Sequence, residues 1–138
     1  MTEPTIAAIY LRSAVSDDNA MAWQRSRCEA FSAARGWRIS EIFSDNGTSG
    51  EQDRSGLQAL RAHLQDGGAR IVLADDVVRL ARDPDLLDTF CRDCEQAGAS
   101  IYTADGEFDM ASPTLLAATA DFLDRLRFDE QVTNARRQ

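Results

Sequence analysis

Short apolar runs alternate with amphipathic segments along the chain. Residues 5–11 form the longest run, and residues 71–74 and 100–103 form shorter ones, each with the length and composition of a buried parallel strand. Residues 37–44 alternate between apolar and polar side chains, which predicts a further strand. Residues 107–110 are expected to form a short edge strand.

Helical spacing fills the segments between these runs. It predicts helices over residues 17–35, 54–66 and 84–97, each followed directly by a glycine, which is a common helix stop signal. A long final helix is expected to open at Ser112-Pro113, since proline suits the first helical turn.

Strands that alternate with helices predict an α/β fold with a mostly parallel sheet flanked by helices. The final helix is longer than a small sheet needs to cover it. We therefore expect a long C-terminal helix whose far end, residues 128–138, projects and contacts a partner.

The 138 residues fit one domain of ordinary size, so we expect a single domain over residues 1–138. No apolar run approaches the roughly 20 residues that a membrane span needs. The first residues lack the basic and apolar regions of a signal peptide. The expected location is the cytoplasm.

The formal net charge is −8, and every one of the 15 basic residues is arginine. Affinity for DNA without sequence preference comes mainly from cations that neutralise phosphates, so this charge argues against unaided DNA binding. Any role on DNA needs a local arginine cluster or another domain.

The three cysteines cannot all pair within one chain, and Cys91 and Cys94 stand three residues apart in a predicted helix. We expect reduced thiols. A zinc site would need Cys28 or His63 as further ligands, and neither has the usual spacing. No metal and no cofactor are therefore predicted.

Arginines and hydroxyls follow the predicted strands. Arg12 and Ser13 follow the first strand, a loop over residues 45–53 leads from the second strand to Arg54, and Arg79 and Arg82 come just after the third. Ligands of parallel α/β sheets bind at the carboxyl ends of the strands, so these guanidinium groups are expected to converge.

Such a cluster would repel itself without an anion, and a guanidinium fork matches two phosphate oxygens. A phosphodiester is the natural ligand. With a nearby hydroxyl as nucleophile, fixed positive charge can stabilise a phosphoryl-transfer transition state without a metal ion.

Four short motifs occur in a fixed order at these positions. They are Tyr10-Leu-Arg12, Asp45-x-Gly47-x-Ser49-Gly50, Asp53-Arg54 and Arg79-Leu80-x-Arg82-Asp83. Together they resemble the catalytic domain of the serine recombinases of the resolvase and invertase type, over nearly the whole chain.

The resemblance implies site-specific DNA recombination, in which a serine attacks the DNA backbone, becomes linked to the 5′ phosphate and religates to a new partner without a cofactor. It implies that Arg12, Arg54, Arg79 and Arg82 bind phosphate. It also implies a homodimer through the final helix, a tetramer during strand exchange, and a separate DNA-binding region absent from this chain.

The chain departs from the family pattern at two positions. Ala14 stands where the pattern has its nucleophilic serine, so Ser13 and Ser16 are the candidate nucleophiles. Val78 stands where the pattern has an aspartate before the first paired arginine, although Asp75 and Asp76 lie close by. The Glu-Arg pair of the family's final helix has its nearest equivalent at residues 124–125.

These departures keep a second hypothesis open, a non-catalytic recombinase-like module that serves in assembly or regulation. A small phosphate-binding domain of flavodoxin-like shape is disfavoured, because no glycine-rich loop follows the first strand. For single residues the simpler interpretations are a solvated Arg54 beside an Asp53 helix cap, a strand-end Ser13 and a helix-capping Ser16.

Four further side chains are interpreted as structural. Trp23 and Trp37 are expected to be core or near-core anchors, Gln24 to be solvated, and His63 to be exposed and inert.

Overall fold

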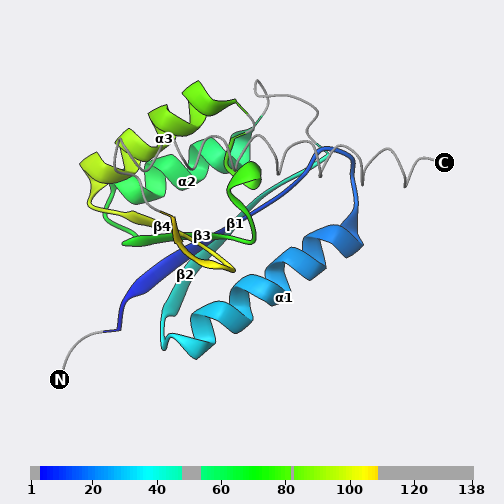
Figure 1. Cartoon of the computed structure of the whole chain (residues 1–138), viewed down its shortest axis with the longest axis horizontal. Coiled ribbons are helices and arrows are strands. Elements are labelled where there is room, and N and C mark those ends of the chain that lie inside the picture. Colours follow the sequence, from blue (N-terminus) through cyan, green and yellow to red (C-terminus); the bar gives the residue numbers. More distant parts are fainter. Residues whose placement is uncertain (1–3, 48–53, 82, 109–138) are drawn as a thin grey trace.

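A computed structural model describes residues 4–47, 54–81 and 83–108 of the chain (Figure 1). The elements in chain order are β1 (Ile6–Ser13), α1 (Asp18–Ala34), β2 (Arg38–Asn46), α2 (Ser55–Gln65), β3 (Ile71–Ala74), a 3-10 turn η1 (Val77–Arg79), α3 (Pro84–Ala97), β4 (Ser100–Thr103) and β5 (Gly106–Phe108).

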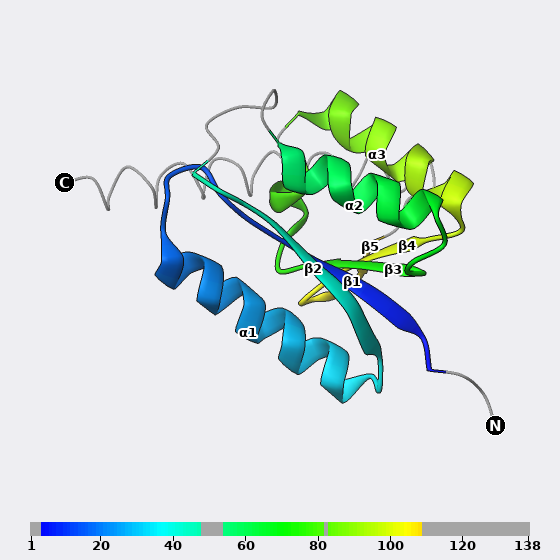
Figure 2. The ribbon, with the colours of Figure 1, turned by 180° about the vertical axis from the view of Figure 1, so that it is seen from behind.

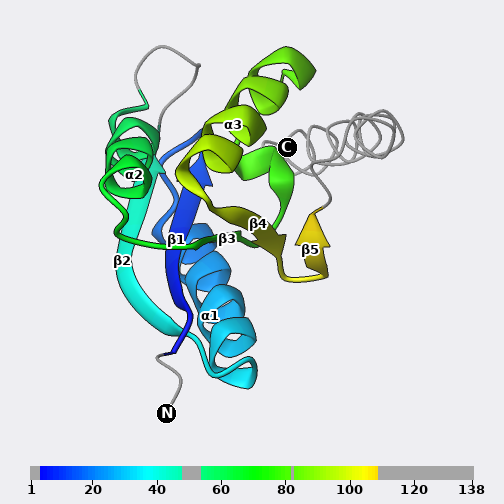
Figure 3. The ribbon, with the colours of Figure 1, turned by 90° about the vertical axis from the view of Figure 1, so that its left-hand side faces the viewer.

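The strands form one sheet in the order β2-β1-β3-β4-β5. The first four strands are parallel, and β5 pairs with β4 in the antiparallel direction. Helix α1 covers one face of the sheet, and α2 and α3 cover the other (Figures 2 and 3). The predicted α/β class, with a mostly parallel sheet flanked by helices, is confirmed.

Most predicted elements have nearly the observed bounds, and β3, α3 and β4 have the predicted ones. Strands β1 and β2 each run two residues further than predicted, because Arg12 and Ser13 pair with Asp45 and Asn46 across the ladder. The turn η1 was not predicted. The long C-terminal helix and its projecting end lie outside the described residues.

Strand β1 lies at the centre of both halves of the core. Ala8 and Tyr10 pack with the apolar faces of α2 and α3, whereas Ile9 and Leu11 pack with Cys28 of α1. Both sets are buried because helices cover both faces of a parallel sheet. In the described part of the chain, no helix is long and apolar enough to cross a membrane.

All three cysteines are buried free thiols. Burial raises the pKa of Cys28, Cys91 and Cys94 to about 12 in each case. The thiolate is the reactive form, so these side chains act as small apolar core residues.

Two structural interpretations of aromatic side chains are wrong. Trp23 is 55% exposed and carries the guanidinium of Arg27 over its ring. His63 is half-buried, 2.9 Å from the Ser40 hydroxyl through Nε2, and its ring packs against Phe43. The contact of Trp23 is local, within α1, whereas His63 is covered by residues of β2.

Trp37 is a near-core residue, as predicted, because it packs against the core cluster on the α1 side of the sheet. It is half-buried in an aromatic cluster with Phe31 and Tyr102, at the end of the molecule where β2 begins. The guanidinium of Arg35 lies over these rings.

The start of α2 approaches β2 so closely that only glycine fits at residue 56. A Cβ added to Gly56 would meet the carbonyl group of Ser44 and lie 3.0 Å from Oδ2 of Asp45. The contact at Ser44 involves backbone, which cannot rotate away. Glycine is usually a poor helix residue, so its presence here reflects this contact.

We expect Gly56→Ala to lower the free energy of unfolding by about 1 to 3 kcal/mol, because the added methyl group forces α2 away from β2. At an unconstrained helix position the same change would stabilise the chain. Urea unfolding measures the difference. The matched control is Ser55→Ala, at an exposed neighbouring position, which is expected to change stability by less than about 0.5 kcal/mol. Equal stabilities of the two variants would contradict the close contact.

Candidate functional site

The carboxyl ends of β1 and β2 present different side chains on the two faces of the sheet. Side chains alternate along a strand, so Arg12 lies on the same face as Tyr10, toward α2 and α3. Its ladder partner Asp45 shares that face. Ser13 and its partner Asn46 lie on the opposite face, toward α1.

Asp45 caps the N-terminus of α2 from a neighbouring strand. Its carboxylate accepts the backbone N–H groups of Gly56 and Leu57 at 2.9 and 3.0 Å, and the hydroxyl of Tyr10 at 2.6 Å. A negative charge at this point also offsets the partial positive charge of the helix end. The predicted Asp53 cap lies outside the described residues, and the residue at the cap position, Arg54, makes no side-chain cap bond.

Arg54 is buried, with 2% of its surface exposed. Its guanidinium donates to the Tyr10 hydroxyl at 2.9 Å from one terminal nitrogen and 3.3 Å from Nε. It also donates to the backbone carbonyls of Leu80, at 2.8 Å, and Arg79. The interpretation of Arg54 as a solvated residue is wrong, whereas its predicted contact with phosphate stays a prediction.

The phenol of Tyr10 therefore joins a buried carboxylate to a buried guanidinium. It donates to Asp45 and accepts from Arg54, so one neutral group is a hydrogen-bond partner of both charged groups. Burial raises the pKa of Tyr10 well above its usual 10.0, and the hydrogen bond to Asp45 raises it further.

Gln24 of α1 holds the backbone of Arg12. Its side-chain amide accepts the N–H of Arg12 at 3.0 Å and donates to the carbonyl of Arg12 at 2.8 Å, in a position that is 1% exposed. The prediction of a solvated Gln24 is wrong. The two bonds fix the end of β1 against α1 and so position the Arg12 side chain.

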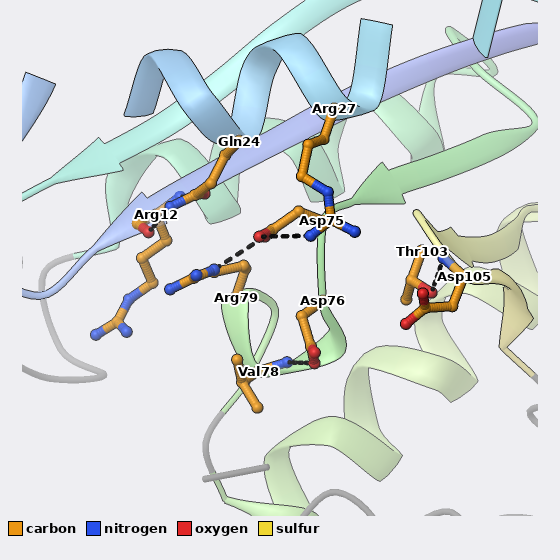
Figure 4. Close-up of polar contacts among 9 residues, drawn as sticks. All are labelled: Arg12, Gln24, Arg27, Asp75, Asp76, Val78, Arg79, Thr103 and Asp105. Carbon is orange, nitrogen blue, oxygen red and sulfur yellow. Dashed lines mark hydrogen bonds and ion pairs between the residues drawn. The ribbon is translucent and has the colours of Figure 1, made fainter. Parts of the chain in front are cut away.

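Arg79 ends η1, directly beyond β3. Its Nε donates to the Asp75 carboxylate at 2.9 Å, and the other Asp75 oxygen lies 4.0 Å from a terminal nitrogen of Arg27. Figure 4 shows the guanidinium groups of Arg12 and Arg79 directed to the same side of the site. Two of the predicted arginines thus lie at or beyond the carboxyl ends of the neighbouring strands β1 and β3.

The candidate nucleophiles are placed differently. Ser13 is half-buried, and its hydroxyl donates to the carbonyl of Val15 at 2.5 Å. Ser16 is exposed and lies against Gly47, directly after β2. Ser16 is not the helix cap, because the α1 cap is the side chain of Asp17. Arg82 lies outside the described residues.

Three of the residues that organise this site were missed by sequence reasoning. The sequence motifs include Tyr10 and Asp45 but assign them no role, and Gln24 is predicted to be a solvated residue on a helix surface. The available signal was the position of Gln24 seven residues into a helix that packs on β1, which puts it on the same face as the buried Cys28.

We expect Tyr10→Phe to lower the free energy of unfolding by about 1 to 3 kcal/mol, because it leaves a buried carboxylate and a buried guanidinium each short of a partner. Tyr102→Phe is the matched control, since the hydroxyl of Tyr102 makes only one long exposed bond, at 3.5 Å. Thermal or urea unfolding of the two variants at neutral pH makes the comparison. A smaller loss for Tyr10→Phe than for Tyr102→Phe would contradict the bridge.

The raised pKa of Tyr10 also predicts a pH dependence. Above pH 10 the unfolded chain releases the phenol proton while the folded chain keeps it, so stability falls as the pH rises. In Tyr10→Phe this contribution is absent, and the fall between pH 10 and 11 should be shallower than in the parent. Urea unfolding of both proteins at pH 10 and pH 11 measures this difference. An equal fall in the free energy of unfolding in the two proteins would contradict the raised pKa of Tyr10.

A comparison with known families matches residues 7–136 to the family described as Resolvase, N terminal domain. The match spans nearly the whole chain and includes all the predicted site residues.

Solved structures agree in fold. A resolvase family site-specific recombinase from Streptococcus pneumoniae superimposes with a TM-score of 0.72 at 20% identity, covering 97% of this chain and 99% of that one. The N-terminal catalytic domain of TP901-1 integrase superimposes with a TM-score of 0.72 at 19% identity, covering 94% of this chain and 99% of that one.

A third structure is the C-terminal catalytic domain of ISC1926 TnpA, an IS607-like serine recombinase. It superimposes with a TM-score of 0.65 at 22% identity, covering 72% of this chain and 70% of that one. At these identities the superpositions establish the fold, and the family match establishes the relationship. The chain belongs to the resolvase N-terminal domain family, and with it to the recombinases as a general class of enzyme.

Proposed function

We propose that this domain cleaves and religates DNA phosphodiesters without a metal ion, through a transient 5′-phosphoseryl link, in site-specific recombination. The observation that carries the proposal is the placement of Arg12, near the end of β1, and Arg79, in the turn after β3, with guanidinium groups directed to the same side in Figure 4. The exposed Ser16 follows β1 in the chain. Arg82 completes the proposed phosphate-binding set.

The arginines supply the chemistry that the reaction needs. Phosphoryl transfer places extra negative charge on the phosphate oxygens in the transition state, and preorganised guanidinium groups stabilise that charge. Arg54 contributes by fixing the backbone of η1, through the carbonyls of Arg79 and Leu80. In the proposed reaction Arg54 is therefore a positioning residue in this state of the protein.

Ser16 is the better placed of the two candidate nucleophiles. The Ser13 side chain belongs to the strand face opposite Arg12, and its hydroxyl is engaged by the Val15 carbonyl. Ser16 is solvent-accessible at the same end of the sheet. An attacking hydroxyl must approach the phosphorus within about 3 to 3.5 Å, which favours a residue on an accessible loop.

A non-catalytic module is the second candidate function. It is favoured by Ala14 at the position where the family pattern has its serine, and by Val78, which packs into the core in place of an aspartate. In that case the domain would serve in the assembly or regulation of a recombination complex.

The proposed partners are DNA, contacted through a separate DNA-binding region, and further copies of this chain, as a homodimer that becomes a tetramer during strand exchange. The net charge of −8 supports the separate region, because this domain would repel DNA outside its arginine cluster.

The nucleophile can be identified by trapping the covalent intermediate. With the domain joined to a DNA-binding region, Ser16→Ala is expected to abolish the protein–DNA adduct on a nicked suicide substrate, whereas Ser13→Ala keeps it. Ser55→Ala, at an exposed position on α2, is the control for loss of a surface hydroxyl. Adduct formation by the Ser13→Ala/Ser16→Ala double variant would rule out both serines.

The two candidate functions differ in the response to Ala14→Ser. If the domain is non-catalytic only because its serine is missing, Ala14→Ser creates adduct formation in a parent that has none. If Ser16 is the nucleophile, the parent already forms the adduct and Ala14→Ser leaves the Ser16 linkage in place. Peptide mapping of the DNA-linked serine separates the two outcomes.

A further inference from the structure

The position of Val78 raises the question of which carboxylate orients Arg79. The family pattern has an aspartate immediately before this arginine. Here Val78 is 5% exposed and packs into the core with Val77 and Leu80. Figure 4 shows the Val78 side chain lying apart from the Arg79 guanidinium.

Asp75 supplies a carboxylate from a different position. It is the first residue after β3, its side chain is 2% exposed, and its Oδ1 accepts Nε of Arg79 at 2.9 Å. The 3-10 turn over Val77–Arg79 makes this contact possible, because it folds the chain back so that residues four apart meet. The pair is therefore built by the backbone that follows the strand.

A buried carboxylate requires compensation, and Asp75 has it from two sides. Arg79 binds one oxygen, and Arg27 of α1 approaches the other at 4.0 Å. Arg27 is held in turn over the ring of Trp23. Asp75 thus belongs to a fixed array of charges that spans β3, η1 and α1.

Arg79 is bound at both its backbone and its side chain. Arg54 binds the Arg79 backbone carbonyl, and Asp75 binds Nε of the side chain. A guanidinium held at Nε has a fixed plane and direction, and in Figure 4 its terminal end points toward the side of Arg12. These contacts favour an Arg79 side chain that is preorganised to bind an anion.

We propose that Asp75 is the positioning residue for Arg79 and takes the orienting role that an aspartate at position 78 would otherwise have. The inference rests on the proposed function, in which Arg79 binds the scissile phosphate. Asp75 touches no substrate and acts only through Arg79.

The test uses Asp75→Asn, Arg79→Gln and their combination, in the domain joined to its DNA-binding region. Asp75→Asn is expected to slow covalent adduct formation by roughly 10- to 100-fold while leaving DNA affinity unchanged. Loss of the negative charge of Asp75 would by itself strengthen phosphate binding. A slower reaction therefore indicates that the Arg79 guanidinium is misplaced. In the Arg79→Gln background, Asp75→Asn should have no further effect. An unchanged rate, or effects that multiply in the double variant, would overturn the proposal.

Asp93→Asn is the matched control. It removes one carboxylate that forms an ion pair with Arg61 between α2 and α3, at 3.4 Å. It is expected to leave the adduct rate unchanged. Should Asp75→Asn fail to fold, Asp75→Glu replaces it, since it retains the charge and displaces the carboxylate by one carbon. A parent-like rate for a folded Asp75→Glu would then overturn the proposal.

An activity-independent measurement separates this inference from the proposed function. The Nε–Hε signal of Arg79 in a nitrogen–proton NMR spectrum, assigned by its loss in Arg79→Gln, should exchange slowly with water in the parent and faster in Asp75→Asn. If the parent forms no adduct but this difference is present, the proposed catalysis fails and the positioning contact stands. If the exchange rates are equal, the positioning role fails whatever the activity.

Discussion

The hydrogen bonds of the Tyr10 hydroxyl connect the parts of the molecule that define the site. One buried phenol, on β1, donates to the carboxylate that caps α2 and accepts from the guanidinium that binds the carbonyls at the end of η1. Buried ions are costly without partners, and the phenol supplies one partner to each of the two charged groups. The consequence is that β1, β2, the start of α2 and the turn after β3 keep a fixed relative position.

This constraint explains how a strongly acidic chain can maintain an arginine-rich edge. The guanidinium of Arg54 is hydrogen-bonded inside the fold to acceptors that belong to the protein, and Nε of Arg79 is bound by Asp75. Arg12 is fixed through its backbone by Gln24, which leaves its side-chain direction to the strand. The three arginines therefore have different functions in the structure, although they share a motif set.

The alternation of side chains along β1 also separates Arg12 from Ser13. Arg12 shares a face with Tyr10 and Asp45, whereas Ser13 shares the opposite face with Asn46, which accepts the N–H of Asp17 at the start of α1. A shift of one residue along a strand moves a side chain to the other face. Ser13, one residue after Arg12, therefore lies on the face of the sheet opposite the Arg12 side chain.

The sequence by itself determined the order and type of the elements, because the periods of apolar residues reflect local geometry and burial. It also placed Arg12 and Arg79 at the carboxyl ends of parallel strands, which end on the same side of a sheet. Only the tertiary structure decided how each side chain is used. The Tyr10–Asp45 and Tyr10–Arg54 contacts join residues 35 and 44 positions apart, and no local pattern reports such distances. The contact between Asp75 and Arg79 is short in sequence, yet it needs the 3-10 turn that apolar periodicity does not reveal, because that turn depends on Val77 and Val78 packing into the core.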